Sequence, residues 1–406
     1  MACRSCGEQK LLELLDLGET PLANSLLSGD ELSSPEEKFP LQLFFCPSCS
    51  LVQIGESVPP EKMFSKYRYF SSYSDTMLAH SQKLAERVIA DRKLGADSLV
   101  IEVASNDGYL LQFYKNRGVG VLGIEPARNV ANHAIEVKGI PTLVEFFGAE
   151  FAAEYVRRNS RCDVLHANNV FAHVPDINGF AEGIRTILKS DGVAYLESPY
   201  LKNLLDNCEF DTIYHELLFY YSLTALDRLF ARHGMLIFDA EKIPIHGGSM
   251  RIHVCHAGYM ARSERATRLL AEELEWGVDS PATYLNFSEK VQNLKKDLCW
   301  LLHDLKSQGK RIAAYGAAAK GSTLINYFDL GRELIDFVAD RSPHKQGLFM
   351  PGKHIPIVAV DVLLEKMPDY VLLFTWNFAD EILEQQKEYR RRGGRFIIPI
   401  PEPTIL

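Results

Sequence analysis

The stretch Leu99–Leu111, L-V-I-E-V-A-S-N-D-G-Y-L-L, predicts the fold of the central part of the chain. It is typical of a buried strand that runs into a tight turn and then a helix. The strand ends on the acid Glu102, and a second apolar strand over Val119–Ile124 ends on Glu125. A strand, a turn, a helix and an acid after the next strand indicate a nucleotide-ribose site at the first crossover of a doubly wound sheet.

The turn at Ser105–Gly108 holds a single glycine, Gly108, so a G-x-G-x-x-G dinucleotide loop is absent. Either the turn holds a cofactor through its backbone and the two acids, or it belongs to a βα unit without a ligand. We favour the cofactor site.

The composition is that of a soluble, globular chain, and the length predicts two or three domains; the alternation of strands and helices predicts the α/β class. The chain has 406 residues, 47% hydrophobic and 24% charged, with a net charge of −9. This acidic balance argues against a protein dominated by nucleic-acid contacts. No apolar run is long enough for a membrane span and the N-terminus has no signal-peptide core, so we expect a cytoplasmic protein with reduced cysteines. A monomer or a weak dimer is expected.

Two C-x-x-C units lie near the N-terminus, at Cys3/Cys6 and at Cys46/Cys49. Each unit offers two thiolates, and four thiolates close the tetrahedral shell of one structural zinc ion. A redox-active C-x-x-C pair or a chance pairing is the alternative. We therefore predict a zinc-binding module over residues 1–75.

Residues 76–258 alternate between helix and strand. Strands are expected at Val144–Phe146 and Cys162–Asn169, and a turn leads into a fifth strand within Leu188–Pro199. A fourth strand that ends in asparagines, followed by a helix and L-K-x-x-G, is typical of class I S-adenosylmethionine methyltransferases. Asn168 and Asn169 would lie at the carboxyl end of that strand, where ligands of such sheets bind; local capping is the other explanation.

Two further stretches carry candidate functional groups. Tyr214, His215 and Glu216 are adjacent titratable groups among large apolar residues, an arrangement that favours proton transfer. A polar surface turn is the alternative. In H-G-G-S-M-R, the paired glycines permit close backbone approach and His246 could face a ligand, unless the segment is an ordinary strand turn.

The last part, residues 259–406, begins with connector helices over 260–305 and continues as a second Rossmann-like α/β unit. Its turn Gly316–Thr323 could hold phosphates through backbone N–H groups with help from Lys320, or be a packing turn. The following strand again ends on an acid, Asp340. Two open sheets in one chain suggest two nucleotide-like ligands that meet at a cleft.

Taken together, the motifs resemble those of the sugar C-methyltransferases over nearly the whole chain. The segments that carry the resemblance are C-R-S-C-G, F-C-P-S-C, E-V-A-S-N-D-G, G-I-E-P, N-N-V-F-A-H-V-P, E-S-P-Y-L, I-Y-H-E, H-G-G-S-M-R, Y-G-A-A-A-K-G-S-T and F-T-W-N. The family acts on nucleotide-linked 4-keto-deoxysugars. The resemblance implies a zinc module, a class I methyltransferase sheet and a second Rossmann-like domain.

The resemblance also implies residue roles. Zinc would be bound by Cys3, Cys6, Cys46 and Cys49. S-adenosylmethionine would be held by Glu102, Ala104, Ser105, Asn106, Gly108, Glu125, Pro126, Asn168 and Asn169. The substrate, with its nucleotide end on the C-terminal domain, would be held by His246, Tyr315, Lys320, Ser322, Thr323, Asp340, Lys345, Trp376 and Asn377. The catalytic candidates are Tyr69, His173, Tyr214, His215 and Glu216, and Tyr69 matches an active-site tyrosine of the family.

One position departs from the family pattern. The family reads Y-x-E-H in the reactive stretch and its histidine is the candidate base, whereas this chain has Leu217 there. We expect His215 or Tyr214 to act as base when a C3 proton beside the ketone is removed to give an enolate. The alternatives are O- or N-methylation, an NAD-dependent oxidoreductase, and a non-catalytic zinc-ribbon binding protein.

Overall fold

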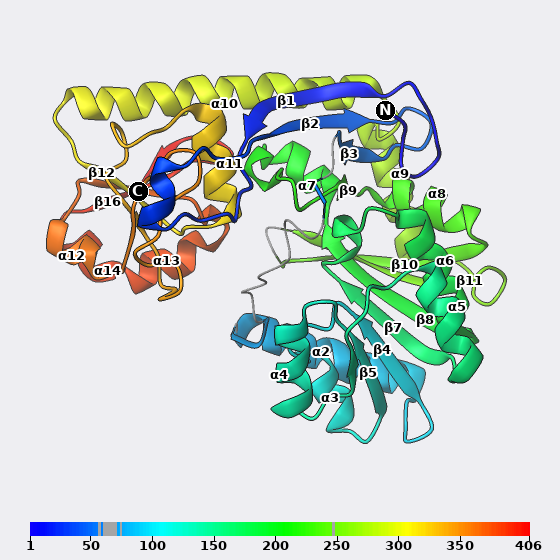
Figure 1. The fold of residues 1–406 in the computed structure, drawn as a ribbon. Helices are drawn as coiled ribbons and strands as arrows, with labels where there is room; N and C mark the ends of the chain where they lie inside the picture. The colour runs from blue at the N-terminus through cyan, green and yellow to red at the C-terminus, as the bar shows by residue number, and fades with distance from the viewer. Residues whose placement is uncertain (56–57, 60–70, 74, 246–247) are drawn as a thin grey trace.

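The computed structural model describes residues 1–55, 58–59, 71–73, 75–245 and 248–406. Two predicted site residues, Tyr69 and His246, lie outside the described residues. Within the described part, none of the helices combines the length and apolar character needed to cross a bilayer. Three sheets organise the chain (Figure 1).

The N-terminal sheet has the order β1-β2-β3-β9 and is antiparallel throughout. Its strands are β1 (Leu12–Thr20), β2 (Phe39–Phe45), β3 (Val52–Ile54) and β9 (Phe219–Tyr220), with the short helix η1 (Gly29–Ser33) between β1 and β2. The fourth strand comes from the central part of the chain, far along the sequence from the two C-x-x-C units. The N-terminal module is thus completed by the residues that directly follow Leu217.

The central sheet has seven strands in the order β10-β11-β8-β7-β4-β5-β6, and β11 alone runs antiparallel to its neighbours. The strands are β4 (Leu99–Val103), β5 (Gly120–Ile124), β6 (Thr142–Leu143), β7 (Cys162–Asn168), β8 (Leu188–Pro199), β10 (Met235–Ile243) and β11 (Ser249–His256). This is the class I methyltransferase sheet that the sequence predicts.

Both faces of the central sheet are covered by helices, which is why its parallel strands are almost continuously apolar. Val100 of β4 packs in the core beneath α2, α3 and α4, and the next residue, Ile101, packs in the core on the opposite face. The helices of this region are α2 (Asp75–Arg92), α3 (Leu111–Lys115), α4 (Arg128–Glu136), α5 (Ala149–Arg158), α6 (Ile177–Ile187), α7 (Leu201–Asp206) and α8 (Leu223–Arg232); η2 (Ser71–Tyr73), η3 (Phe171–His173) and η4 (Phe210–Thr212) are single turns.

The predicted third strand is wrong in position. The structure has β6 at Thr142–Leu143, where it pairs only with the end of β5, instead of at Val144–Phe146. Phe146 is 66% exposed, because the chain has left the sheet edge by that point. An apolar run at an edge strand can therefore lie beyond the last paired residue.

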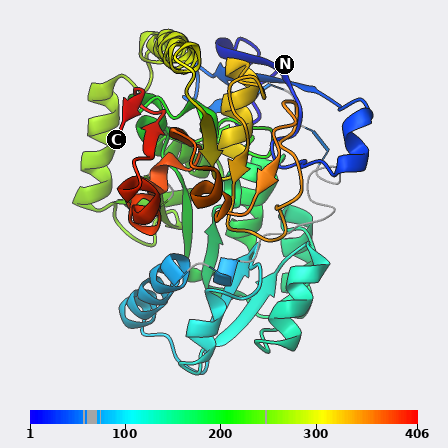
Figure 2. The same cartoon turned by 90° about the vertical axis from the view of Figure 1, so that its left-hand side faces the viewer.

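Two connector helices, α9 (Glu264–Trp276) and α10 (Pro281–Ser307), confirm the helical prediction for 260–305. Near the start of the 27-residue α10, Tyr284 stacks on Phe45 of β2 with ring centroids 4.1 Å apart. The helix then runs along β1 and continues to the C-terminal half (Figure 1). Figure 2, viewed from the side of the C-terminal half, shows α10 nearly end-on above the rest of the chain. The helix thus joins the N-terminal and C-terminal sheets.

The C-terminal sheet has the order β14-β13-β12-β15-β16-β17, parallel except for β17. Its strands are β12 (Ile312–Tyr315), β13 (Val338–Ala339), β14 (Ile357–Val358), β15 (Tyr370–Leu373), β16 (Arg395–Ile398) and β17 (Thr404–Ile405). Its helices are α11 (Ala319–Phe328), α12 (Val362–Lys366), α13 (Ala379–Gln385), α14 (Lys387–Arg391) and the turn η5 (Trp376–Phe378). The second Rossmann-like unit is confirmed.

Candidate active site

The turn after β4 has positive φ angles at three alternate residues. Ala104, Asn106 and Gly108 have φ angles of +52°, +49° and +75°. The left-handed region is the natural place for glycine and costs an L-residue about 1–2 kcal/mol. The turn therefore has the alternating geometry of a glycine-rich loop with one glycine only. A Cβ atom at Gly108 would lie 2.9 Å from Ile140, so this position has no room for a side chain.

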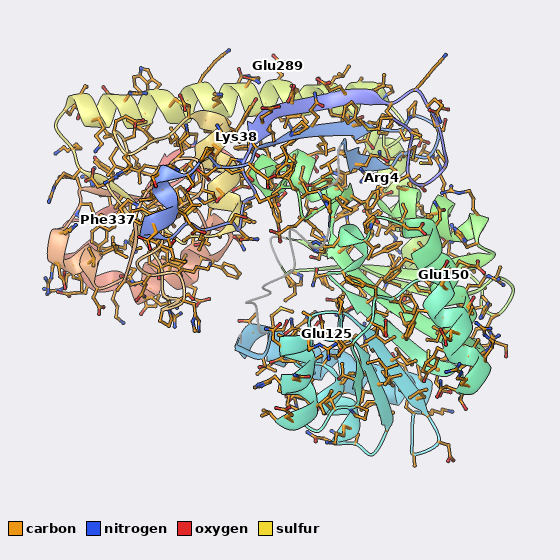
Figure 3. All side chains as sticks on the ribbon, in the orientation of Figure 1. Arg4, Lys38, Glu125, Glu150, Glu289 and Phe337 are labelled. Atoms are coloured by element: carbon orange, nitrogen blue, oxygen red, sulfur yellow. The ribbon has the colours of Figure 1, made fainter. Side chains whose placement is uncertain are left out.

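Glu125, at the end of β5, closes this turn from the neighbouring strand. Its Oε2 accepts the backbone N–H of Asn106 at 2.9 Å, and its Oε1 accepts that of Ala127 at 2.8 Å. The intervening Pro126 has no N–H to donate. Burial raises the pKa of the Glu125 carboxyl, while the two backbone donors oppose the shift. Figure 3 shows Glu125 at the end of the sheet that faces the N-terminal sheet.

Close approach between the turn and β5 depends on Gly123. A Cβ atom there would lie 2.4 Å from Ser105 Oγ and 2.9 Å from Thr142 Oγ1. Ser105 also donates its N–H to the carbonyl of Ile124 at 3.3 Å. The glycine lets the turn fold down onto the second strand.

Several buried polar atoms at the carboxyl ends of β4 and β7 have no hydrogen-bond partner within the described chain. They are both carboxylate oxygens of Glu102, Ser105 Oγ, Asp107 Oδ1 and Asn168 Oδ1. Complete burial raises the pKa of Glu102 well above its usual range, assisted by Asp107, Glu125 and Glu197, although the Tyr109 phenol opposes the shift. Asp107 Oδ1 and Asn168 Oδ1 are acceptors, and the Glu102 carboxyl becomes one when a cationic ligand favours its ionised form; acceptors suit a ligand that presents an ammonium group and ribose hydroxyls. These side-chain oxygens therefore fit S-adenosylmethionine, which carries both kinds of group.

The other predicted cofactor residue, Asn169, has a backbone role. Its φ angle is +54° and its N–H donates to the carbonyl of Glu197 at 2.8 Å, so it turns the chain away at the end of β7. This agrees with the capping alternative for Asn169, whereas the unpartnered Asn168 oxygen agrees with the ligand alternative.

The turn after β4 is also held by the segment that precedes α2. Ser71 donates its N–H to Asn106 Oδ1 at 3.0 Å, and Ser72 Oγ donates to Asp107 Oδ2. Lys138 lies 3.3 Å from the same Asp107 oxygen. The chain that enters the central region therefore reaches the turn two residues after Tyr69.

The reactive stretch Tyr214–Leu217 forms a turn, closed by the Leu217 N–H on the Tyr214 carbonyl at 3.0 Å. His215 is buried and directs Nε2 to the carbonyl of Phe39 in β2 at 3.2 Å. Glu216 Oε1 accepts from Asn24 Nδ2 at 2.7 Å, and burial raises the pKa of the Glu216 carboxyl. His215 and Glu216 thus contact the N-terminal module.

His173, one of the predicted catalytic candidates, has a hydrogen bond that fixes its tautomer. Its Nδ1 lies 2.6 Å from the Glu216 carbonyl oxygen, and because a carbonyl only accepts, Nδ1 carries the proton. Burial lowers the pKa of His173, so the ring is neutral at physiological pH and its Nε2 holds the lone pair. His173 lies in η3, five residues beyond Asn168 at the carboxyl edge of the sheet. The hydrogen bond to the Glu216 carbonyl joins His173 to the reactive stretch.

In the C-terminal half, Asp340 at the end of β13 accepts the N–H groups of Ala317 at 2.7 Å and Ser342 at 2.8 Å. Lys345 donates to the carbonyl of Ala317 at 2.7 Å and lies 3.9 Å from Asp340. Tyr315 is buried, and its hydroxyl has no hydrogen-bond partner among the described residues. Asp340 and Lys345 therefore brace the turn after β12.

The remaining predicted substrate residues fall into two groups. Ser322 Oγ donates to the Ala23 carbonyl at 2.7 Å and Thr323 Oγ1 to the Ile213 carbonyl at 3.0 Å, and both residues are buried. These hydroxyls fasten α11 to other parts of the chain, so we do not carry them into the substrate site. Lys320, Trp376 and Asn377 instead gather at the carboxyl ends of β12 and β15.

The four N-terminal cysteines form one cluster, with all sulfur atoms within 4.8 Å of one another. Cys3 and Cys49 are 3.6 Å apart, and Cys6 and Cys46 are 3.5 Å apart. Tetrahedral ligands 2.3 Å from zinc would be about 3.8 Å apart. The cluster lowers the pKa of Cys3 to about 5, through its hydrogen bond with Cys49, and raises that of Cys46 to about 12, mainly by burial. Four thiolates can coexist here only around a cation, and the residues fit zinc.

Comparison with known proteins now places the chain. It matches the family models described as "C-methyltransferase C-terminal domain" over residues 244–401, "Methyltransferase domain" over 77–237 and "Putative zinc binding domain" over 3–64. It is 36% identical over 405 residues to the C-methyltransferase NovU of Streptomyces niveus, which covers 100% of this chain and 96% of the relative. The chain belongs to the C-methyltransferase family.

Solved structures that match are more distant. An S-adenosylmethionine-dependent methyltransferase from Clostridium acetobutylicum is 10% identical, with a TM-score of 0.36, and covers 49% of this chain and 96% of its own. The CcbJ methyltransferase from Streptomyces caelestis is 11% identical, with a TM-score of 0.36, and covers 48% of this chain and 96% of its own. Membership of this family confirms the predicted enzyme class, methyltransferase. The oxidoreductase and the non-catalytic binding protein are therefore not retained as alternatives.

Proposed function

We propose that this enzyme transfers a methyl group from S-adenosylmethionine to a carbon beside the ketone of a nucleotide-linked 4-keto-deoxysugar, at C3. The observation that carries the proposal is the bond between His173 Nδ1 and the Glu216 carbonyl, 2.6 Å long. It joins a neutral imidazole at the carboxyl edge of the methyltransferase sheet to the stretch where the family places its base. Loss of that base at Leu217 is therefore compatible with carbon methylation.

The cofactor residues divide by the atoms they offer. Glu102 presents a buried carboxyl at the end of β4, Asn168 presents an unpartnered amide oxygen at the end of β7, and Glu125 holds the turn at the end of β5. Ala104, Ser105, Asn106 and Gly108 supply the backbone of the turn. When bound, S-adenosylmethionine supplies a sulfonium methyl group that accepts an electron pair.

The chain's own contribution is proton transfer and orientation. His173 Nε2 removes the proton from the carbon beside the ketone, and the electron pair is delocalised onto the carbonyl oxygen as an enolate. A phenol donates to that oxygen, and Tyr214 and Tyr69 are the candidates. The turn at Tyr214–Leu217 holds the reacting carbon in place, and this positioning supplies most of the rate enhancement.

The C-terminal half supports a nucleotide-linked substrate through its cation. Lys320 lies at the carboxyl end of β12 beside the Trp376 ring and Asn377, where the ligands of open sheets bind. An ammonium group suits a diphosphate, and an indole ring suits a flat apolar or heteroaromatic group. His246, Tyr315, Asp340 and Lys345 remain proposals for the same substrate.

A two-part experiment tests the function. Panels of dTDP-, GDP- and CDP-linked 4-keto sugars are incubated with methyl-labelled S-adenosylmethionine, and the products are located by mass spectrometry. The same substrates are then incubated in D₂O without methyl donor, and carbon methylation predicts deuterium exchange at the methylated carbon. Label found on oxygen or nitrogen, without exchange, would establish O- or N-methylation instead.

A further inference from the structure

The polar cluster at the carboxyl ends of β12 and β15 contains a lysine that lies near two acids, Asp211 and Glu209, without forming a direct ion pair among the described residues. The Lys320 ammonium lies 4.4 Å from the centre of the Trp376 ring and 3.5 Å from Asn377 Oδ1, and within the described chain it forms no ion pair. The chain continues from β12 to β13 on one side and returns to β15 on the other. Lys320 and Trp376 therefore flank the point where ligands bind in such sheets.

A carboxylate from the methyltransferase half reaches this same cluster. Asp211, in η4, is completely buried, and its Oδ2 accepts the Trp376 indole N–H at 2.8 Å. Its Oδ1 has no hydrogen-bond partner among the described residues. Burial raises the pKa of Asp211 to about 6 and Glu209 adds to the shift, whereas Lys320 and the Trp376 bond oppose it. The nearby Cys208 thiol also interacts with Asp211, which adds to the rise in the Cys208 pKa caused mainly by burial.

Asp211 lies next to the reactive stretch and is held against the C-terminal half. Phe210 stacks on Phe328 of α11 with ring centroids 4.8 Å apart. On the other side of Asp211, the Ile213 carbonyl accepts from Thr323 of α11 at 3.0 Å. Tyr214–Leu217 follow immediately. A movement of Asp211 relative to Trp376 would therefore change the position of that turn.

The chain holds a second copy of this trio, which serves as an internal comparison. Trp276 donates its indole N–H to Asp206 Oδ1 at 3.1 Å, and Lys202 lies 5.1 Å from the centre of that ring. There Lys202 pairs directly with Asp206, which is 43% exposed. An exposed pair needs no further partner. The Lys320 trio differs in both respects: its acid is buried, and within the described residues its lysine forms no direct ion pair with that acid.

We propose that Asp211 is a positioning residue that couples an anion subsite at Lys320 to the reactive stretch at Tyr214–Leu217. The inference rests on the proposed function for the identity of the anion, the diphosphate of the nucleotide-linked substrate. The coupling has a definite direction. An anion beside Lys320 cancels the positive charge that favours the Asp211 carboxylate, so the carboxyl takes up a proton and its contact with Trp376 changes.

A spectroscopic experiment tests the coupling without catalysis. Trp276→Phe and Trp300→Phe leave Trp376 as the only tryptophan, since the chain has three. Its fluorescence is titrated with pH, first alone and then with saturating dTDP-glucose, whose diphosphate diester keeps its charge over this range and which lacks a ketone. We expect a transition near the Asp211 pKa of about 6, shifted upward by the probe.

Two variants isolate the groups in this titration. Asp211→Asn keeps an acceptor for Trp376 but cannot titrate, so the transition should disappear. Lys320→Met should itself move the transition upward and abolish the further shift by dTDP-glucose. A transition that persists in Asp211→Asn, or one that dTDP-glucose leaves in place when it binds, overturns the proposal; so does a failure of dTDP-glucose to bind.

Kinetics separate this inference from the proposed function. With a 4-keto sugar that the enzyme methylates, Asp211→Asn should lower kcat about tenfold while the dissociation constant of S-adenosylmethionine stays unchanged. Asp206→Asn, in the exposed trio, should leave kcat as in the wild type. An equal kcat in both variants, in an enzyme that methylates the sugar, contradicts the coupling alone. A coupled pH transition in an enzyme that methylates none of the sugars contradicts the proposed function alone.

Discussion

The central and C-terminal sheets of this protein share one topology up to their fifth strands. In the central sheet the chain runs from β4 to β5 and β6 on one side and then to β7 and β8 on the other; in the C-terminal sheet it runs from β12 to β13 and β14 and then to β15 and β16. The acid after the second strand has the same task in both. Glu125 accepts the N–H groups of Asn106 and Ala127, and Asp340 accepts those of Ala317 and Ser342.

The two halves differ in what their crevices offer a ligand. Between β4 and β7 the buried polar groups include the Glu102 carboxyl and the Asn168 amide oxygen. Between β12 and β15 the prominent group is the cation Lys320, beside an indole ring. In both halves, the hydrogen bonds that the strand-end acid accepts from backbone N–H groups are enough to explain its presence. The shared motif therefore identifies the fold, and the unpartnered groups around it identify the ligand.

The largest expected effect concerns the N-terminal sheet, which holds the reactive stretch between the two halves through β9. Cys46→Ser removes one of four zinc ligands, and structural zinc contributes about 10 kcal/mol or more to folding. We expect loss of zinc and of methyl transfer, measured by metal analysis and turnover. The dissociation constant of S-adenosylmethionine should stay within about twofold, because the central sheet is a separate site. Cys299→Ser, on α10, is the matched control and should keep both zinc and activity.

A second test asks whether the chemistry lies at the edge of the central sheet. His173→Asn keeps a donor for the Glu216 carbonyl but removes Nε2, so kcat and deuterium exchange should fall by about 10²–10⁴-fold. His215→Asn should alter stability more than kcat, because His215 contacts Phe39 of the N-terminal sheet. The reverse ranking of the two variants would move the base to His215.

A third test contrasts the two strand-end acids directly. Glu125→Ala removes the acceptor that shapes the turn after β4, and we expect S-adenosylmethionine to bind about 10–100-fold more weakly, since bonds to charged groups contribute about 1.5–3 kcal/mol. Asp340→Ala makes the same change in the C-terminal half and should leave that affinity unaltered. Calorimetric titration of both variants gives the comparison. Equal losses of S-adenosylmethionine affinity in the two variants would contradict the assignment of the cofactor to the central sheet.

The smallest effect is on stability and depends on pH. Glu102 is buried and its pKa is raised, so its contribution to folding stability falls as pH rises above about 4.5, the ordinary glutamate value, towards the raised one. Glu102→Gln should therefore raise the free energy of unfolding by about 1–3 kcal/mol near pH 8, with a smaller gain at pH 5. It should also weaken S-adenosylmethionine binding.

Asp340→Asn is the matched variant in the C-terminal half, and urea unfolding measures both. Because both Asp340 oxygens already accept backbone N–H groups, this variant should destabilise the protein by about 1–3 kcal/mol. Stability changes of the same sign in the two variants would contradict the difference drawn between the two crevices.

Local patterns predicted much of this molecule. The apolar strands, the connector helices and the two C-x-x-C units could be recognised because each depends on neighbouring residues or on one spacing. The left-handed backbone at Ala104 could not be recognised, because alanine rarely adopts a positive φ angle, whereas Asn106 and Gly108 are residue types that adopt it more readily. The choice of base among the catalytic candidates stays a prediction: adjacency in the chain favoured His215 and Tyr214, whereas the contact between His173 and Glu216 is visible only in the fold.

The sequence by itself determined the class I sheet, the second Rossmann-like unit, the four zinc ligands and the family. These follow from hydrophobic periodicity and motif spacing, which are properties of the chain in order. Only the tertiary structure decided that β9 completes the N-terminal sheet, that His173 contacts Glu216, and that Asp211 reaches Trp376. Each is a contact between segments tens to hundreds of residues apart, and such contacts are set by packing of the three sheets rather than by any local pattern.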